Sequence, residues 1–226
     1  MPARRNQSNI VIGEVVLSGW LEIPAKSKGI VVFAHGSGSS RFSARNNAVA
    51  EFLREGQLGT LLFDLLTSDE ECIDSVTREY RFDIPLLSQR LASTINWLSK
   101  QSEAADLPVG LFGSSTGAAA ALIVAARIPN QVAAVVSRGG RVDLAGDYLD
   151  KVEAPTLMIV GGVDYEVLRL NTAAREQTRG VSEIAVVDQA SHLFEEPGTS
   201  EQVASLARDW FVKYLAAPRL SDQIES

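Results

Sequence analysis

Alternating apolar and polar positions mark the first thirty residues of the chain. Two alternating runs cover Ile10 to Leu17 and Trp20 to Ile23, and Ser18-Gly19 joins them. Alternation puts every second side chain on the same face of a strand, so each run predicts a strand with one buried face. We therefore expect an N-terminal antiparallel hairpin that turns at Ser18-Gly19.

Short apolar runs rich in β-branched residues replace the alternation from residue 29 onward. These runs are Ile30 to Phe33, Thr60 to Phe63, Val109 to Phe112, Val132 to Val136, Thr156 to Val160 and Ile184 to Val187. Continuous apolar runs of this length are typical of strands that are buried on both faces.

Helical spacing fills the intervals between these runs. The clearest helix is carried by Ile84, Leu87, Leu91, Ile95 and Leu98, whose spacings of three and four share one face. A last helix is predicted from a capping box at Thr199 and Gln202 and from a stripe of Val203, Leu206, Trp210 and Tyr214. Strands that alternate with helices predict an α/β fold, with a mostly parallel central sheet and helices on both faces.

Composition narrows the class of protein. The 226 residues include 21 Lys plus Arg against 28 Asp plus Glu, a net charge of −7, with 46% hydrophobic and 22% charged residues. This balance predicts a single globular domain over residues 1–226, with 217–226 as a frayed tail. The negative charge disfavours nucleic acid and anionic membrane surfaces as partners. We expect a monomer or a small homo-oligomer.

The scarcity of cysteine and histidine removes whole classes of site. One cysteine and two histidines exclude an internal disulfide and the Cys-rich or three-His zinc sites, and we expect no metal and no cofactor. Asp69, Glu70 and Glu71 are adjacent rather than alternately spaced, so we expect a solvated loop there and no cation. The N-terminus lacks the apolar segment of a signal peptide, which favours a cytoplasmic location.

The sharpest local signal is Gly113-Ser114-Ser115-Thr116-Gly117, a G-x-S-x-G sequence between an apolar run and an Ala-rich helical stretch. Small residues two positions before and after the serine allow the chain to turn sharply. Such a turn lifts the Ser115 hydroxyl above the sheet edge and aims the Thr116 N–H at a developing oxyanion. We predict that Ser115 is a nucleophile; the alternative is a Gly/Ser turn without chemistry.

A serine hydroxyl needs a base to take its proton, and the chain offers His35 and His192. His192 follows the last apolar run and should lie at the sheet edge where Ser115 emerges, so we predict that it is the base. His35 opens a Gly- and Ser-rich loop, residues 36–40, that can bring a backbone amide to the oxyanion. We expect His35 to anchor this loop.

A carboxylate should orient the histidine. Asp164 follows the run Thr156 to Val160 and is favoured, because its strand neighbours the strand that delivers His192. Asp143, in the loop after the run Val132 to Val136, is the alternative.

The chain order Ser115, Asp164, His192, with an HGSG loop after the third strand, resembles the α/β-hydrolase fold. The GGVD run and the ASHLF histidine loop are similar to the dienelactone hydrolase-like family over residues 29–215. The resemblance implies nucleophile Ser115, acid Asp164, base His192, and oxyanion donors at the amides of Thr116 and Ser37. True dienelactone hydrolases have a cysteine nucleophile, so the serine points to general esters.

The expected activity is hydrolysis of small carboxylic esters through an acyl-enzyme. A thioesterase or acyltransferase would use the same triad, and a non-catalytic ligand-binding protein is the alternative from another class. The interval between Val136 and Thr156 is too short for a lid domain, which favours short acyl chains. His35, Arg41, Arg138 and Arg141 are candidate substrate contacts, although ordinary ion pairs are an alternative for the arginines.

Overall fold

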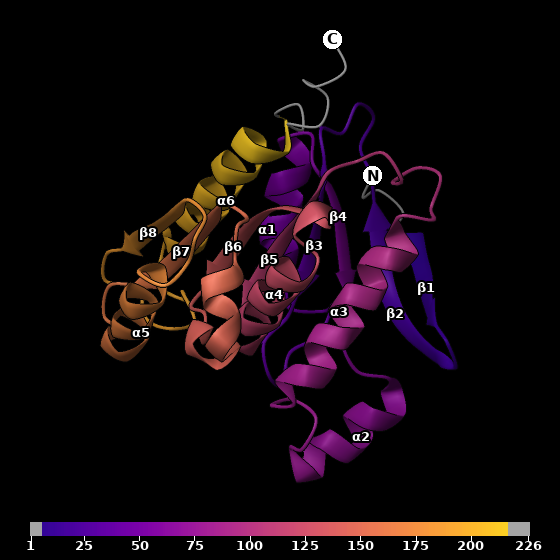
Figure 1. Ribbon diagram of the computed structural model, residues 1–226, viewed down its shortest axis with the longest axis horizontal. Helices are drawn as coiled ribbons and strands as arrows, with labels where there is room; N and C mark the ends of the chain where they lie inside the picture. Colours follow the sequence, from indigo (N-terminus) through magenta and orange to yellow (C-terminus); the bar gives the residue numbers. More distant parts are fainter. Residues whose placement is uncertain (1–5, 217–226) are drawn as a thin grey trace.

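A single sheet organises the computed structural model, which describes residues 6–216 (Figure 1). Its strand order is β1-β2-β4-β3-β5-β6-β7-β8. The strands are β1 (Asn6–Ile12), β2 (Val15–Glu22), β3 (Ile30–Ala34), β4 (Gly59–Phe63), β5 (Val109–Ser114), β6 (Val132–Arg138), β7 (Thr156–Gly161) and β8 (Ser182–Val187). β1 and β2 form an antiparallel hairpin, β2 is antiparallel to β4, and β3 to β8 are parallel. The predicted α/β fold is confirmed; the predicted frayed tail, residues 217–226, lies outside the described residues.

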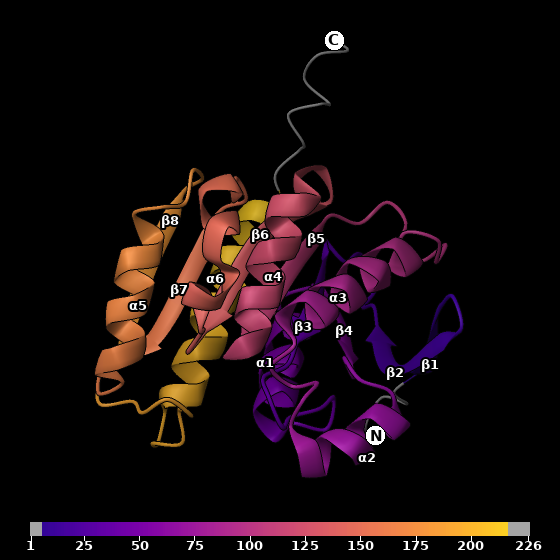
Figure 2. The same ribbon diagram turned by 60° about the horizontal axis from the view of Figure 1, so that its bottom comes forward.

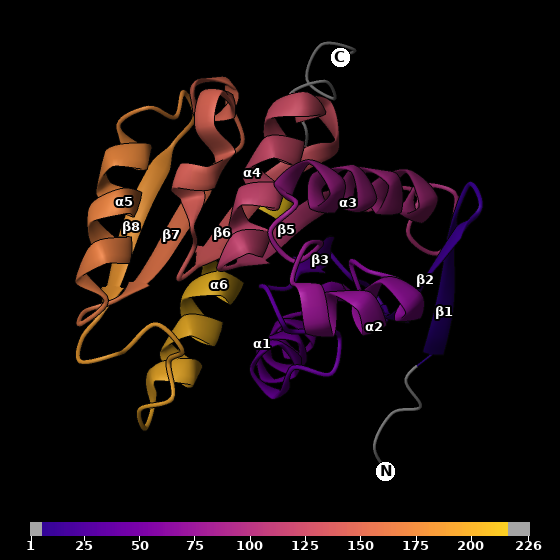
Figure 3. The ribbon, with the colours of Figure 1, turned by 90° about the horizontal axis from the view of Figure 1, so that it is seen from below.

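Helices cover both faces of the sheet, as predicted (Figure 3). They are α1 (Ala44–Glu55), α2 (Ser68–Thr77), α3 (Ile84–Leu98), α4 (Thr116–Arg127), α5 (Tyr165–Arg175) and α6 (Thr199–Leu215), with short 3₁₀ helices η1 (Pro129–Gln131) and η2 (Val142–Lys151). One face carries α3, α4 and α5, and the other carries α1 and α6 (Figures 2 and 3). A cluster of buried apolar side chains fills each interface. Between β6 and β7 the chain carries only η2 and its loops, so no lid domain is inserted there.

The hairpin is confirmed, but its predicted turn is wrong. The chain turns at Gly13-Glu14, where Gly13 has the left-handed φ of 60° that a tight hairpin turn requires. Ser18 and Gly19 lie inside β2, and a Cβ at Gly19 would lie 3.0 Å from Ile10 Cδ1 and 3.1 Å from Phe63 Cβ. Gly19 therefore serves close packing within the sheet rather than chain reversal.

The two predicted helices form, with a change in the second. The five predicted core residues of α3 are all buried. In α6 the capping box is absent: Gly198 holds the N-cap position, and the Thr199 hydroxyl donates to Glu196 O at 2.7 Å. Phe211 and Leu215 face the core together with Trp210, whereas Tyr214 is only partly buried.

Two further predictions about local structure are wrong. Residues 68–77 form helix α2 where we expected a loop, because Glu70 and Thr67 form a capping box and Glu70 also pairs with Arg90 at 2.7 Å. Strand β8 is only half-buried, since it lies at the edge of the sheet. No helix among residues 6–216 combines the length and the apolar character needed to cross a membrane.

Candidate active site

Ser115 occupies a sharp turn between β5 and α4. Its backbone has φ 50° and ψ −119°, a region that non-glycine residues rarely adopt. A Cβ at Gly113 would collide with Ala118 Cα, and one at Gly117 would collide with Ala34 O. The two glycines thus let helix α4 begin directly at the end of the strand, as the G-x-S-x-G sequence predicts.

The loop after β6 holds the backbone of Ser115 in place. The Ser115 N–H donates to Arg138 O at 3.2 Å, and Ser115 O accepts from the Arg141 N–H at 3.1 Å. These bonds satisfy both polar groups of a residue in a strained conformation, so residues 138–141 are part of the site.

His192 and Asp164 come together across the ends of β8 and β7. His192 Nδ1 lies 2.7 Å from Asp164 Oδ2, so the ring donates its Nδ1 proton to the carboxylate and leaves Nε2 to accept a proton. The ring also packs against Gly139, in the segment that hydrogen-bonds the Ser115 backbone, because a Cβ at Gly139 would lie 3.4 Å from His192 Cε1. The structure places the three predicted triad residues after the carboxyl ends of β5, β7 and β8, at one edge of the sheet, with β6 between β5 and β7.

Two backbone amides are available at the sharp turn that carries Ser115, which we call the elbow. Within the described residues, neither the Thr116 N–H nor the Ser37 N–H donates to another protein group. The loop that carries Ser37 touches the nucleophile, since a Cβ at Gly36 would lie 3.1 Å from Ser115 Cβ. Free N–H groups at a helix start and in an adjacent loop are suited to a developing oxyanion.

His35 anchors this loop. Its Nδ1 lies 3.0 Å from Gly36 O, and its Nε2 accepts the Leu65 N–H at 3.0 Å. Burial lowers its pKa, which keeps the ring neutral. Both ring nitrogens are engaged by the backbone, which is the arrangement that an anchor of this loop requires.

Two of the three candidate arginines, Arg41 and Arg141, bind carboxylates. Arg41 forms an ion pair with Asp64, and its guanidinium lies 4.3 Å from the Phe42 ring centroid. Arg141 binds Asp143 through Nε at 2.9 Å and Nη2 at 2.8 Å. This hydrogen bonding raises the pKa of Arg141 and lowers that of Asp143, so the alternative acid is engaged away from His192.

The sequence did not predict the ion pair of Asp74 and Arg81, which supports the loop of residues 36–40. The buried Asp74 carboxylate accepts the N–H groups of Tyr80 and Arg81 at 2.8 and 2.9 Å and Arg81 Nε at 2.6 Å. A Cβ at Gly38 would lie 3.2 Å from Arg81 Nη1, so this arginine packs on the loop. No sequence motif joins Asp74 to Arg81, because they meet across the end of a helix that we did not predict.

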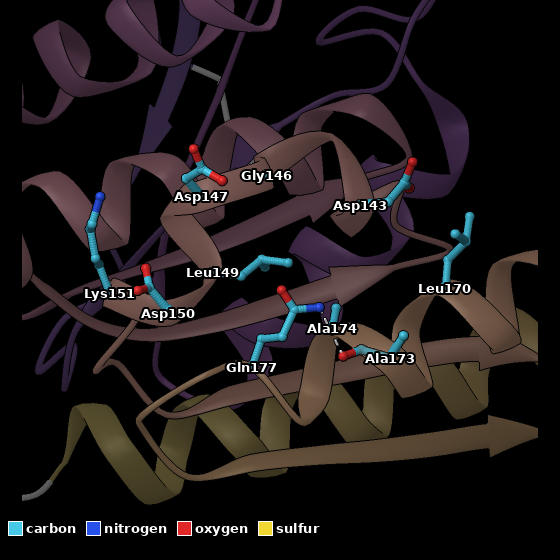
Figure 4. A pocket seen from close by; sticks show the side chains of 10 residues that line it. All are labelled: Asp143, Gly146, Asp147, Leu149, Asp150, Lys151, Leu170, Ala173, Ala174 and Gln177. Carbon is cyan, nitrogen blue, oxygen red and sulfur yellow. Dashed lines mark hydrogen bonds between the residues drawn. The ribbon is translucent and has the colours of Figure 1, made fainter.

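Two cavities lie beside the site. One of about 550 Å³ between η2 and α5 is lined by Asp143, Asp147, Asp150 and apolar residues of α5, and none of the predicted triad lines it (Figure 4). Another of about 380 Å³ borders His35, residues 38–42 and the start of α2. No cluster of three or more His, Cys, Asp or Glu in residues 6–216 could hold a metal ion.

Comparisons with known proteins agree with this architecture. Residues 88–217 match the family model of the X-Pro dipeptidyl-peptidase (S15 family). A dienelactone hydrolase from Anabaena variabilis is 52% identical, with a TM-score of 0.92 over 93% of this chain and 98% of that chain. Est1E from Butyrivibrio proteoclasticus, 15% identical, has the same fold, with a TM-score of 0.76 over 93% and 99% of the two chains.

The fold and the elbow define the α/β-hydrolase class of proteins. The chain belongs to the dienelactone hydrolase-like family within that class, which supports a hydrolase. Two curated proteins of Mycobacterium tuberculosis that carry the provisional name phosphoribosyl transferase are 55% identical over 217 residues. The match covers 96% of this chain and 48% of theirs, so the chain spans about half the length of these relatives.

Proposed function

We propose that this chain is a serine esterase that hydrolyses small carboxylic esters through an acyl-enzyme. The observation that carries the proposal is the position of Ser115 on a strained elbow at the sheet edge where His192 is hydrogen-bonded to Asp164. A nucleophile, a base and a group that orients the base are the parts that acyl transfer needs.

The reaction proceeds in two halves. Ser115 Oγ attacks the ester carbonyl while His192 Nε2 takes the hydroxyl proton, and the amides of Thr116 and Ser37 stabilise the negative charge on the carbonyl oxygen. His192 then gives the proton to the leaving alcohol as the C–O bond breaks. Water, deprotonated by the same ring, attacks the acyl-enzyme and releases the acid and free Ser115. Each step uses protein groups and water.

Alternative functions share parts of this arrangement. A thioesterase or acyltransferase would differ in the leaving group or the acceptor, and a ligand-binding protein would lack turnover. The provisional phosphoribosyl transferase name belongs to chains about twice as long. A relative at 52% identity that the chain covers over 98% of its length is a dienelactone hydrolase, which favours ester hydrolysis for this chain.

Labelling with a fluorophosphonate probe tests the proposal. We expect the adduct on Ser115, and Ser115→Ala should lower kcat for an activated ester by about 10⁶-fold. Ser114→Ala is the matched control, because Ser114 is buried and its hydroxyl hydrogen-bonds Asn46 at 3.4 Å. An adduct on another residue, or near-normal turnover by Ser115→Ala, would refute the assignment.

A further inference from the structure

Arg138 lies between the predicted nucleophile and the predicted base. It is the last residue of β6 and pairs in register with Ser114 of β5. Its carbonyl accepts the Ser115 N–H at 3.2 Å, and the next residue, Gly139, lies against the His192 ring. The Arg138 backbone therefore contacts Ser115, and the residue after it contacts His192.

The Arg138 guanidinium has no acceptor among residues 6–216. Its side chain is half-buried on the face of β6 that Ala134 and Val136 direct toward α1 and α6. The other described arginines either bind a carboxylate or are exposed to solvent. Arg138 alone among them combines partial burial with a guanidinium that no protein group satisfies.

The surroundings of Arg138 make it a site of uncompensated positive charge. Burial and, to a lesser extent, the positive charge of Arg45 together lower the pKa of Arg138 to about 10. Arg45 is held only by Glu195, at 2.7 Å, in a pair whose side chains are 37% and 64% exposed. Exposed pairs of this kind are weak, so Arg45 is free to turn toward another anion. A partly desolvated cation without a protein acceptor carries a cost, and a bound oxyanion would lower that cost.

The charge count favours a phosphate group over a carboxylate. The charge of Arg45 acts on Arg138, and each guanidinium presents a planar fork of donors that matches oxyanions. A phosphate monoester carries nearly two negative charges at neutral pH and three acceptor oxygens, whereas a carboxylate carries one charge and two oxygens. One phosphate can therefore satisfy both cations.

We propose that Arg138, with Arg45, binds a phosphate group on the substrate, and that the enzyme acts on small carboxylic esters that carry such a group. This inference rests on the proposed esterase function of Ser115. The phosphate is a handle and does not react: the ester bond alone breaks, and the handle holds the carbonyl against the nucleophile.

A matched set of activated esters tests the inference. 4-Nitrophenyl butyrate, mono-4-nitrophenyl succinate and 4-nitrophenyl phosphonooxyacetate present a neutral, a singly charged and a phosphorylated acyl group. We expect the wild type to prefer the phosphorylated ester, and Arg138→Met to lower the ratio of its kcat/KM to that of the butyrate by about 30- to 100-fold. Arg138→Lys, which keeps the charge and loses the fork, should lose about tenfold.

The control variant is Arg127→Met, which removes an exposed arginine at the end of α4 and should leave the ratio unchanged. A preference of the wild type for the succinate, or a ratio within twofold of wild type in Arg138→Met, would overturn the inference.

Binding of inorganic phosphate, measured by calorimetry without any ester, separates this inference from the proposed function. We expect Arg138→Met to weaken phosphate binding by at least about tenfold. Arg138-dependent phosphate binding in a protein that turns over no ester would support the anion site and refute the esterase. Normal ester turnover with phosphate binding that ignores Arg138 would refute the anion site alone.

Discussion

At the scale of single residues, two carboxylates near the site differ in the side chain that each one binds. Asp164 and Asp143 both follow parallel strands at the same edge of the sheet. Asp164 accepts from His192, while Asp143 is engaged by Arg141, two positions before it in the chain. Strand order placed both near the edge, and local ion pairing decided which one meets the imidazole.

Replacing each carboxylate in turn tests this division. Asp164→Asn should lower kcat for a small activated ester by about 10⁴-fold, because an amide no longer holds the imidazole in the tautomer that leaves Nε2 free. Asp143→Asn is the control, since it loosens only the pair with Arg141, and it should change kcat by less than about tenfold. Steady-state kinetics of both purified variants gives the comparison. A larger loss in Asp143→Asn would transfer the orienting role to the earlier loop.

The residues of the site were predictable to the extent that strand ends are predictable. Ser115, His192 and Asp164 each follow an apolar run, and the carboxyl ends of parallel strands meet at one edge. The ion pair of Arg41 with Asp64, and the lack of such a partner for Arg138 among residues 6–216, were not predictable, because both depend on side chains that are distant in sequence.

Among the helices, α2 shows why a local pattern can mislead. Adjacent acidic residues indicated a solvated loop, yet Glu70 caps the helix and Asp74 is its only buried residue. A helix held mainly by polar contacts has little apolar periodicity, so the usual signal for a helix is absent. The helices whose stability comes from an apolar stripe, such as α3, were predictable.

Asp74 should therefore contribute strongly to the stability of the fold. Its carboxylate is 1% exposed and bonded to Arg81 and two backbone amides, so Asp74→Ala should lower the free energy of unfolding by about 3 kcal/mol at pH 7, measured by urea denaturation. Asp69→Ala removes an exposed carboxylate from the same helix and is the control. It should change the free energy of unfolding by less than about 0.5 kcal/mol.

The effect of Asp74 should vanish in acid. Burial alone would raise its pKa, but the hydrogen bonds from Arg81 and the backbone lower it below the ordinary value of 3.8. The stabilisation is thus complete above that value and is lost as pH falls through the lower pKa of the folded state. Wild type and Asp74→Ala should approach equal stability there, and a difference that persists in strong acid would assign the effect to packing.

For the molecule as a whole, the short connection between β6 and β7 limits how much substrate can be enclosed. Only η2 and its loops stand there, and the cavity near the sheet edge is lined largely by polar residues of the loop 38–42 and of the start of α2. Each buried methylene would add about 0.8 kcal/mol to binding, but the fold offers little apolar wall beyond the first few carbons.

A series of 4-nitrophenyl esters of increasing acyl length tests this expectation. We expect kcat/KM to be highest for acyl chains of about two to six carbons and to fall for longer ones. With a long-chain ester, the rate should show no extra increase once the ester concentration exceeds the critical micelle concentration. A steady rise from butyrate to palmitate would mean that the protein encloses long chains.

The buried anchor of the loop before the nucleophile has a use in spectroscopy. The chain contains two histidines, and the ring nitrogens of His35 are both occupied by the backbone, whereas His192 keeps one nitrogen open. In nitrogen-15 spectra of the labelled wild-type protein, we therefore expect the imidazole of His35 to stay neutral and to serve as a reference for that of His192. A resonance that moves is then assigned to His192, so the proposed proton transfer at its ring can be followed without altering a single residue.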